Sequence, residues 1–314
     1  MCIDGHLLNK LLWFEGLNTL NICLSIIRRH IVIGGFLGYS VGVLLALNLG
    51  GTFTFPLILL SYLAVFFGDL STHFSNDYYD VDLDRKALKK TFGGSNLLVK
   101  HPKIRPLAFR IALVLSLLSV LTSLIVVLVF SASVYLLLIV IIANLFGWLY
   151  STPPLRLNAR GFGEIIISLG TGFTVPTIGY LATLRSIDWT FLRFSVPLML
   201  YGFILSLSQE MPDREVDREN GKLNLVVLMG RRSIALLIFL LAVIATGYII
   251  AYVSSMFRHF WVLPLLSLAP LVAGLRGFHL RSETQIQTNQ NSAIIIYALF
   301  FFLVTLNGYL LLSL

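Results

Sequence analysis

The sequence has little charge and few of the residues that build disulfide or zinc sites. Only 12% of its 314 residues are Asp, Glu, Lys or Arg, and the mean hydropathy is +0.87. A soluble domain carries about 25% charged residues, so this class is excluded. The two cysteines, Cys2 and Cys23, lie near the N-terminus without metal-type spacing. We therefore predict neither a disulfide framework nor a zinc site.

What the sequence does have is long apolar runs, in a chain that is 57% hydrophobic. About twenty apolar residues are needed to cross a hydrocarbon core as a helix. Nine segments meet this criterion: 31–49, 55–75, 107–128, 131–149, 162–183, 194–209, 233–253, 259–275 and 292–313. The pattern predicts an all-α polytopic membrane protein with nine transmembrane helices, embedded in a lipid bilayer.

The chain contains no Ser/Gly linker or low-complexity stretch, so we expect one domain over residues 1–314. Its N-terminus lacks the basic start and small-residue cleavage site of a signal peptide. Residues 1–30 instead resemble an amphipathic segment that lies on the membrane surface.

The basic residues predict how the chain is oriented. With the N-terminus inside, 20 of the 23 Lys and Arg fall on the cytoplasmic side, and only Arg185, Arg193 and Arg258 fall outside. This asymmetry follows the positive-inside rule, so the net charge of +8 indicates topology in a cell membrane and not nucleic-acid binding. The N-terminus and the polar connections 76–106 and 210–232 are predicted to be cytoplasmic, and the C-terminus external.

Acidic residues are concentrated after the second apolar segment, in "NDYYDVDLD" at residues 76–84. If the helix continues through this stretch, each residue turns it by about 100°. Asn76, Asp80 and Asp84 then form one stripe of oxygen ligands, at about 0°, 40° and 80°. Asp82 falls on the opposite face. The spacing predicts a converging group and one outward carboxylate.

A second acidic cluster, "SQEMPDREVDRENGK", follows the sixth apolar segment. Gln209, Asp213 and Asp217 repeat the spacing of the first stripe, and Glu215 points away from it. Like charges four residues apart on a helix repel each other, so such stripes are unfavourable unless a cation binds them. The alternative is a pair of ordinary polar loops with helix-capping acids.

Ligand sets made only of oxygen favour a hard cation such as Mg²⁺, which completes its shell with water and phosphate oxygens. Two such sites facing each other would bind a diphosphate between them. Nearby basic residues are candidates for direct diphosphate contact, or are topology charges: Arg85, Lys86, Lys89, Lys90 and Lys222. His73 is expected to be an interfacial or helix-packing histidine.

The two clusters resemble the NDxxDxxxD and DxxxD motifs of the UbiA superfamily of intramembrane prenyltransferases. "GGSNLLV", "YSTPPLRLNARGFGE" and "DREVDRENGK" are similar to its menaquinone-pathway branch, which prenylates 1,4-dihydroxy-2-naphthoate. The chain departs from the family pattern at two positions. Gln209 stands where many members have Asn, and Asn224 stands where Thr is common.

The resemblance implies a bundle of nine helices around a central cavity, capped by cytoplasmic loops. It implies that two Mg²⁺ ions are bound with the diphosphate by Asn76, Asp80, Asp84, Asp213 and Asp217. It implies catalytic roles for Asp80, Asp213 and Tyr150, and diphosphate contacts for Arg29, Arg85, Lys89, Arg156 and Lys222. For Tyr150 an aromatic-belt position is the alternative, and for Arg29 a topology charge.

The activity implied is Mg²⁺-dependent transfer of a polyprenyl group from polyprenyl diphosphate to a small aromatic acceptor, 1,4-dihydroxy-2-naphthoate. Alternative acceptors are 4-hydroxybenzoate, a glycerol phosphate lipid precursor and haem. A transporter with an acidic cytoplasmic gate is the alternative outside enzymes. Transporters place their acids near the bilayer midplane, whereas here both clusters follow the ends of apolar segments.

Overall fold

The computed structural model describes residues 26–86, 97–253, 262–279 and 284–314, and all regular elements within these ranges are helices. The first half contains α2 (Arg29–Asn48), α3 (Phe55–Lys86), α4 (Leu97–Lys100), α5 (Arg105–Phe130), α6 (Val134–Ser151), α7 (Gly163–Leu169) and α8 (Val175–Leu184). The second half contains α9 (Trp189–Glu210), α10 (Arg214–Glu219), α11 (Leu225–Met229), α12 (Arg231–Tyr248), α13 (Val262–Leu266), α14 (Leu268–His279) and α15 (Gln285–Leu312).

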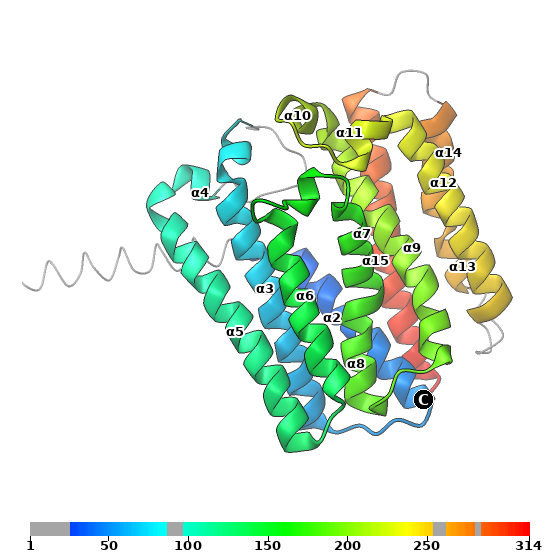
Figure 1. Cartoon of the computed structure of the whole chain (residues 1–314). Coiled ribbons are helices and arrows are strands. Elements are labelled where there is room, and N and C mark those ends of the chain that lie inside the picture. The colour runs from blue at the N-terminus through cyan, green and yellow to red at the C-terminus, as the bar shows by residue number, and fades with distance from the viewer. Residues whose placement is uncertain (1–25, 87–96, 254–261, 280–283) are drawn as a thin grey trace, which may run out of the picture.

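The long helices stand side by side in one bundle (Figure 1). In the described residues, eight helical stretches are long and apolar enough to cross a membrane. They coincide with eight of the nine predicted segments, with ends shifted by a few residues in most cases. The ninth segment, 259–275, corresponds to a shorter apolar stretch, Leu263–His279, which is divided between α13 and α14. A polytopic membrane protein is therefore confirmed, and the count of nine stays a prediction.

Close approach of backbones holds α2 against α8. A Cβ added at Gly42 would lie 1.9 Å from the carbonyl oxygen of Pro176, and one added at Gly179 would lie 2.3 Å from that of Tyr39. Helices in a membrane gain little from hydrophobic burial against each other, because lipid is equally apolar. Small residues instead allow tight van der Waals contact, which these two glycines provide reciprocally.

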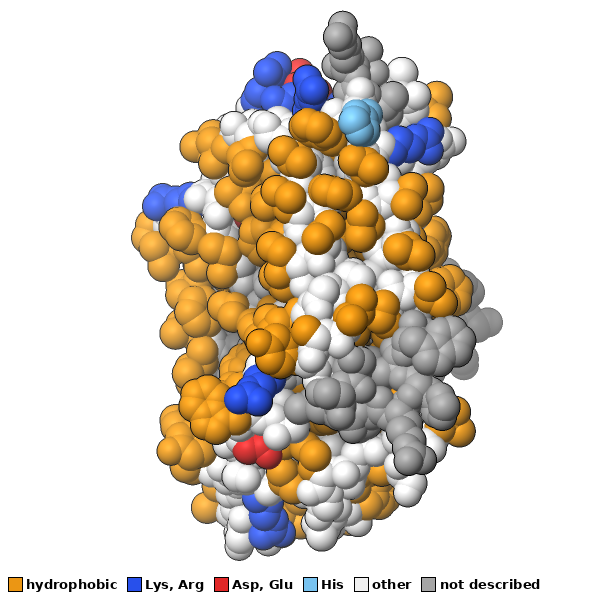
Figure 2. Space-filling model, turned by 90° about the vertical axis from the view of Figure 1, so that its right-hand side faces the viewer, with side chains coloured by type: hydrophobic (Ala, Val, Ile, Leu, Met, Phe, Trp, Pro, Cys, Tyr) orange, Lys and Arg blue, Asp and Glu red, His pale blue; other side chains and the backbone are white. Residues whose placement is uncertain are grey.

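The outside of the bundle is apolar. Leu117, Leu128, Ile244 and Val272 are among the many large hydrophobic side chains that are more than half exposed. Figure 2 shows the side formed by α12 to α14, where hydrophobic side chains are spread over much of the face and the few Lys and Arg lie mostly toward its upper and lower ends. Such a surface suits lipid, so the fold is that of an integral membrane protein.

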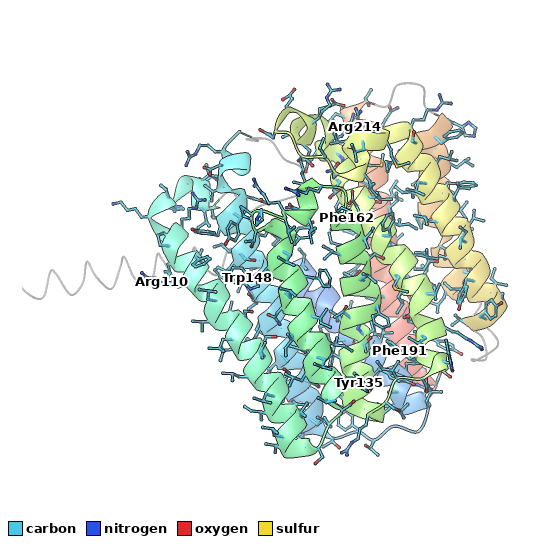
Figure 3. The ribbon with its side chains drawn as sticks, in the orientation of Figure 1. Arg110, Tyr135, Trp148, Phe162, Phe191 and Arg214 are labelled. Atoms are coloured by element: carbon cyan, nitrogen blue, oxygen red, sulfur yellow. The ribbon has the colours of Figure 1, made fainter. Side chains whose placement is uncertain are left out.

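Both acidic motifs lie at the same end of the bundle. The C-terminal end of α3, the short α4, and α10 and α11 are together at the top of Figure 1, and the C-terminus is at the opposite end. In Figure 3, Arg214 and Phe162 lie toward the motif end, and Tyr135 and Phe191 toward the other. The predicted interfacial segment 1–30 falls largely outside the described residues.

We expect the motif end to face the cytoplasm. Single cysteines at Lys103 and Glu219, in a background without Cys2 and Cys23, should react with a membrane-impermeant reagent only from the cytoplasmic side. A cysteine at Ser186, on the loop between α8 and α9, should react only from outside. All three positions are exposed. Labelling of Lys103 and Glu219 from opposite sides would rule out a shared site.

Candidate active site

The first acidic motif is helical throughout, because α3 continues to Lys86. Asp80 is buried at this position, whereas the Asp82 side chain is 69% exposed and lies 3.9 Å from Arg105. The 100° arithmetic therefore describes this pair correctly: Asp80 turns inward and Asp82 outward.

Asp80 faces the loop that follows α6. Nη2 of Arg156 lies 3.8 Å from its Oδ1, and Nδ2 of Asn158 donates to its Oδ2 at 3.5 Å. Arg156 has a φ of 42°, in the left-handed region that few residues other than glycine adopt. This loop conformation brings the Arg156 guanidinium beside a carboxylate that is 76 residues away in the sequence.

Two further contacts join the first motif to α2 and α6. The amide oxygen of Asn76 accepts a hydrogen bond from the hydroxyl of Ser151, the last residue of α6. Nη2 of Arg28, directly before α2, lies 2.8 Å from Oδ1 of the buried Asp77. The Arg29 side chain is outside the described part of the structure. Arg28, which the sequence did not single out, is thus a further arginine beside this motif.

The second motif is not on one continuous helix, contrary to its assumed stripe geometry. Helix α9 ends at Glu210, a 3₁₀ turn spans Met211–Asp213, and α10 begins at Arg214. The break has a local cause: Pro212 has no N–H and its ring clashes with the carbonyl four residues earlier. Asp213 and Asp217 are nevertheless both buried, and the Glu215 side chain is 46% exposed. Asp213 and Asp217 are thus directed inward and Glu215 outward as predicted, but the 3₁₀ turn and not a continuous helix produces this arrangement.

Lys222 is the cation beside Asp217 of the second motif. Its Nζ lies 3.2 Å from Oδ2 of Asp217 and 3.8 Å from Oε1 of Glu210. Burial by itself lowers the pKa of Lys222, but Glu210 and Asp217 and, more weakly, Tyr150 and Asp80 raise it above its usual range. Lys222 therefore stays charged, and acids from both motifs act on it.

Sequence reasoning missed two buried acids near the second motif. Glu210 ends α9 beside Lys222. Glu164 is in the first turn of α7, where its Oε1 accepts a hydrogen bond from the backbone N–H of Leu225 at 2.6 Å. A Cβ at Gly163 would lie 3.3 Å from the Tyr150 ring, so this ring packs at the start of α7. Acids at the ends of apolar segments were the available signal, because such residues are commonly functional.

Asn224, which stands where Thr is common in the family, makes two hydrogen bonds that explain this departure. Its Nδ2 donates to Oδ2 of Asp217 at 2.8 Å, and its Oδ1 accepts from the backbone N–H of Val227 at 2.8 Å. The side chain therefore caps α11 and positions a motif carboxylate simultaneously. A threonine in this position has only one side-chain oxygen for both contacts.

Several predicted residues are not brought into the site by the described structure. Arg85 is exposed at the end of α3. Lys89, Lys90 and the glycines of "GGSNLLV" fall in residues 87–96, outside the described residues. The side chain of Asp84 is also outside them, although its backbone is part of α3.

The donor chemistry of the site fits magnesium. The candidate metal-ligand atoms at this end of the bundle are side-chain oxygens, from Asn76, Asp80, Asp213 and Asp217. The three aspartates are buried. Among the described residues, no group of three or more His, Cys, Asp or Glu side chains is arranged to bind a metal ion. Mg²⁺ is commonly bound through only one or two carboxylates, with water and phosphate oxygens as the other ligands. The residues present are compatible with that mode.

Taken together, these observations define an intramembrane protein with two acidic motifs at one end of its helical bundle and a basic side chain beside each. A family model described as the UbiA prenyltransferase family matches residues 36–305. The chain belongs to this family and is a prenyltransferase enzyme. The family match decides against the transporter alternative.

The relatives agree with this assignment. The chain is 24% identical over 256 residues to 1,4-dihydroxy-2-naphthoate octaprenyltransferase of Bacillus subtilis (strain 168), covering 80% of each chain. Its fold is similar to that of digeranylgeranylglyceryl phosphate synthase (TM-score 0.68, 19% identity, covering 93% of this chain and 99% of that one). It is also similar to an Archaeoglobus fulgidus UbiA homologue bound to DMAPP and Mg²⁺ (TM-score 0.64, 20% identity, 90% and 99% covered).

Proposed function

We propose that this enzyme transfers a polyprenyl group from a prenyl diphosphate to 1,4-dihydroxy-2-naphthoate, in a reaction that requires Mg²⁺. The observation that carries the proposal is the contact of both acidic motifs with fixed cations: Arg156 beside Asp80, and Lys222 beside Asp217. The acceptor is supported by the Bacillus subtilis relative and by the "DREVDRENGK" segment. We further propose that the site faces the cytoplasm.

The site has the charges needed to bind a diphosphate head. Asn76, Asp80, Asp84, Asp213 and Asp217 are the proposed ligands of two Mg²⁺ ions. When bound, the ions supply Lewis-acid neutralisation of charge that develops on the diphosphate. Arg156 and Lys222 are proposed to donate directly to diphosphate oxygens, and Arg29, Arg85 and Lys89 remain candidates for the same role. The apolar prenyl tail belongs between the helices.

The bond changes explain why these groups are needed. The allylic C–O bond breaks with its electron pair leaving on the diphosphate, where Arg156 and Lys222 stabilise the negative charge. Positive charge on the prenyl carbon is stabilised by the face of the Tyr150 ring. A ring carbon of the acceptor then forms the new C–C bond, and loss of a proton restores its aromaticity. Burial of the site excludes water, which would otherwise capture the prenyl cation.

A competition assay tests the acceptor. Purified enzyme with Mg²⁺ and a series of polyprenyl diphosphates is given equimolar 1,4-dihydroxy-2-naphthoate and 4-hydroxybenzoate, and products are identified by mass spectrometry. Prenylated naphthoate should predominate by about tenfold or more, since a site built for one acceptor's hydroxyls rejects others that leave its polar groups unpaired. A prenylated hydroxybenzoate as main product would refute the acceptor and leave the prenyltransferase assignment intact.

A further inference from the structure

An acid and a histidine lie in the part of α3 that crosses the apolar bundle. Asp69 and His73 are within the candidate span Phe55–Asp82, and His73 is buried. At 1.5 Å per residue they lie about 10.5 Å and 4.5 Å deeper along α3 than Asn76. Ionisable side chains inside membrane spans are unfavourable unless they have a function or a partner, so their retention here calls for an explanation.

Both residues share the face of α3 that carries the first motif. With Asn76 at 0°, Asp69 falls at about 20°, His73 at about 60° and Asp80 at about 40°. The same arithmetic places Tyr62 at about 40° on this face. The polar stripe thus continues from the diphosphate end of the site toward the middle of the bundle, and aromatic rings follow it.

The local geometry couples the two side chains. Nε2 of His73 lies 3.6 Å from Oδ1 of Asp69, one helical turn away. The Asp69 side chain remains 27% exposed, while that of His73 is 6% exposed. The imidazole therefore lies near one carboxylate oxygen, just beyond hydrogen-bond distance, and the carboxylate retains accessible surface for another partner.

The carboxylate of Asp69 lies next to α2 at Gly35, a position without a side chain. A Cβ added at Gly35 would lie 4.0 Å from Oδ2 of Asp69, and one added at Gly34 would meet no atom within 4 Å. One carboxylate oxygen of Asp69 is thus close to the α2 backbone, where glycine adds no side-chain bulk.

Aromatic rings border the same region. The rings of Phe36 on α2 and Tyr62 on α3 meet edge to face with centroids 5.2 Å apart, and the Tyr62 and Phe66 centroids are 6.3 Å apart. Such rings favour contact with a flat aromatic molecule. The region thus combines a partly exposed carboxylate, a glycine of α2 and aromatic rings.

We propose that Asp69 and His73 form the recognition site for the aromatic acceptor, with the Asp69 carboxylate accepting a hydrogen bond from a ring hydroxyl. His73 orients the carboxylate, and the Phe36 and Tyr62 rings contact the flat face of the acceptor. The inference rests on the proposed function, because it needs a hydroxylated aromatic substrate. The depth of about 4.5 to 10.5 Å below Asn76 suits a ring system whose reacting carbon lies next to the diphosphate.

The test compares acceptor kinetics of purified Asp69→Asn, Asp69→Glu and His73→Gln enzymes. Asp69→Asn should raise the acceptor KM at least tenfold and leave the prenyl diphosphate KM within twofold, and Asp69→Glu should restore part of the loss. The wild type should prefer the free dihydroxy acceptor to its mono-methyl ether by tenfold or more, and Asp69→Asn should reduce this preference to about twofold. Asp82→Asn, an exposed acid on the same helix, is the control.

A second pair of variants tests the position of Gly35 next to Asp69 and leaves the Asp69 charge unchanged. Gly35→Leu should raise the acceptor KM at least tenfold, because its side chain would lie against the Asp69 carboxylate and block access to it. Gly247→Leu is the control on another helix, because a Cβ at this α12 glycine would meet no atom within 4 Å. It should leave both KM values within twofold, and size-exclusion profiles establish that each variant is folded.

The outcomes distinguish failure of the proposed acceptor site from failure of the proposed function. If the wild type prenylates no aromatic acceptor, the proposed function fails and the acceptor site falls with it. If the wild type prenylates the acceptor while folded Asp69→Asn and Gly35→Leu keep the wild-type acceptor KM and hydroxyl preference, the acceptor site alone is overturned. A structural helix-packing role would change stability and would not change the hydroxyl preference.

Discussion

Asp80→Asn, Asp213→Asn and Asp217→Asn should each lower the rate of prenyl transfer by roughly a hundredfold or more. Each replaces a buried motif carboxylate with a neutral side chain and removes a proposed magnesium ligand. Loss of one contact that stabilises developing charge commonly costs two to three orders of magnitude in rate. The measurement is steady-state turnover of a polyprenyl diphosphate with 1,4-dihydroxy-2-naphthoate, over a range of Mg²⁺ concentrations.

The two exposed motif acids provide matched controls. Asp82→Asn and Glu215→Gln remove the same type of charge from the same motifs, yet these side chains are 69% and 46% exposed and pair with arginines. Their rates should change only severalfold. Raising Mg²⁺ should partly rescue the inward variants and not alter the outward ones. An Asp82→Asn enzyme as damaged as Asp80→Asn would show that the helical face does not select the ligands.

Lys222→Met should destabilise the folded enzyme strongly, by about 3 to 5 kcal/mol. Lys222 is only 16% exposed and lies between Asp217 and Glu210. Removal of the ammonium leaves two buried carboxylates without their compensating charge, which is the costly way to break a buried ion pair. Thermal unfolding in detergent measures the change, and Lys222→Met with Glu210→Gln should recover part of it because one of the two acids is then neutral.

Arg218→Met is the control for this effect. Arg218 forms a surface pair with Glu215 at 3.4 Å, and its side chain is 62% exposed. Such pairs contribute about 0 to 1 kcal/mol, so its midpoint of unfolding should shift little. Equal shifts for Lys222→Met and Arg218→Met would mean that Lys222 is not the charge that holds the second motif together.

The pattern of apolar segments along the sequence was sufficient to predict most of the helices. Apolar segments of spanning length predicted eight helical stretches to within a few residues at most ends, because a bilayer requires helices whose length is set by its thickness. The first motif was also predictable in detail. A helix that continues unbroken has a constant angle per residue, so the opposite orientations of Asp80 and Asp82 follow from spacing alone.

The second motif shows where periodicity is insufficient. Its repeat spacing predicts the same stripe, but Pro212 ends α9 and inserts a 3₁₀ turn, so a constant 100° does not apply. The proline was visible in the sequence as a helix breaker. The direction in which the chain would turn, and hence the burial of Asp213, depends on neighbouring helices.

What the sequence by itself determined is the membrane class, the approximate helix boundaries, the two acidic motifs and the face of α3 that carries the first. Only the tertiary structure decided which cations meet which acids. Arg28 reaches Asp77 across 49 positions and Arg156 reaches Asp80 across 76, while Glu164 bonds Leu225 across 61. The physical reason is that helical periodicity relates residues within a few turns of each other, whereas these contacts depend on how separate helices and loops pack.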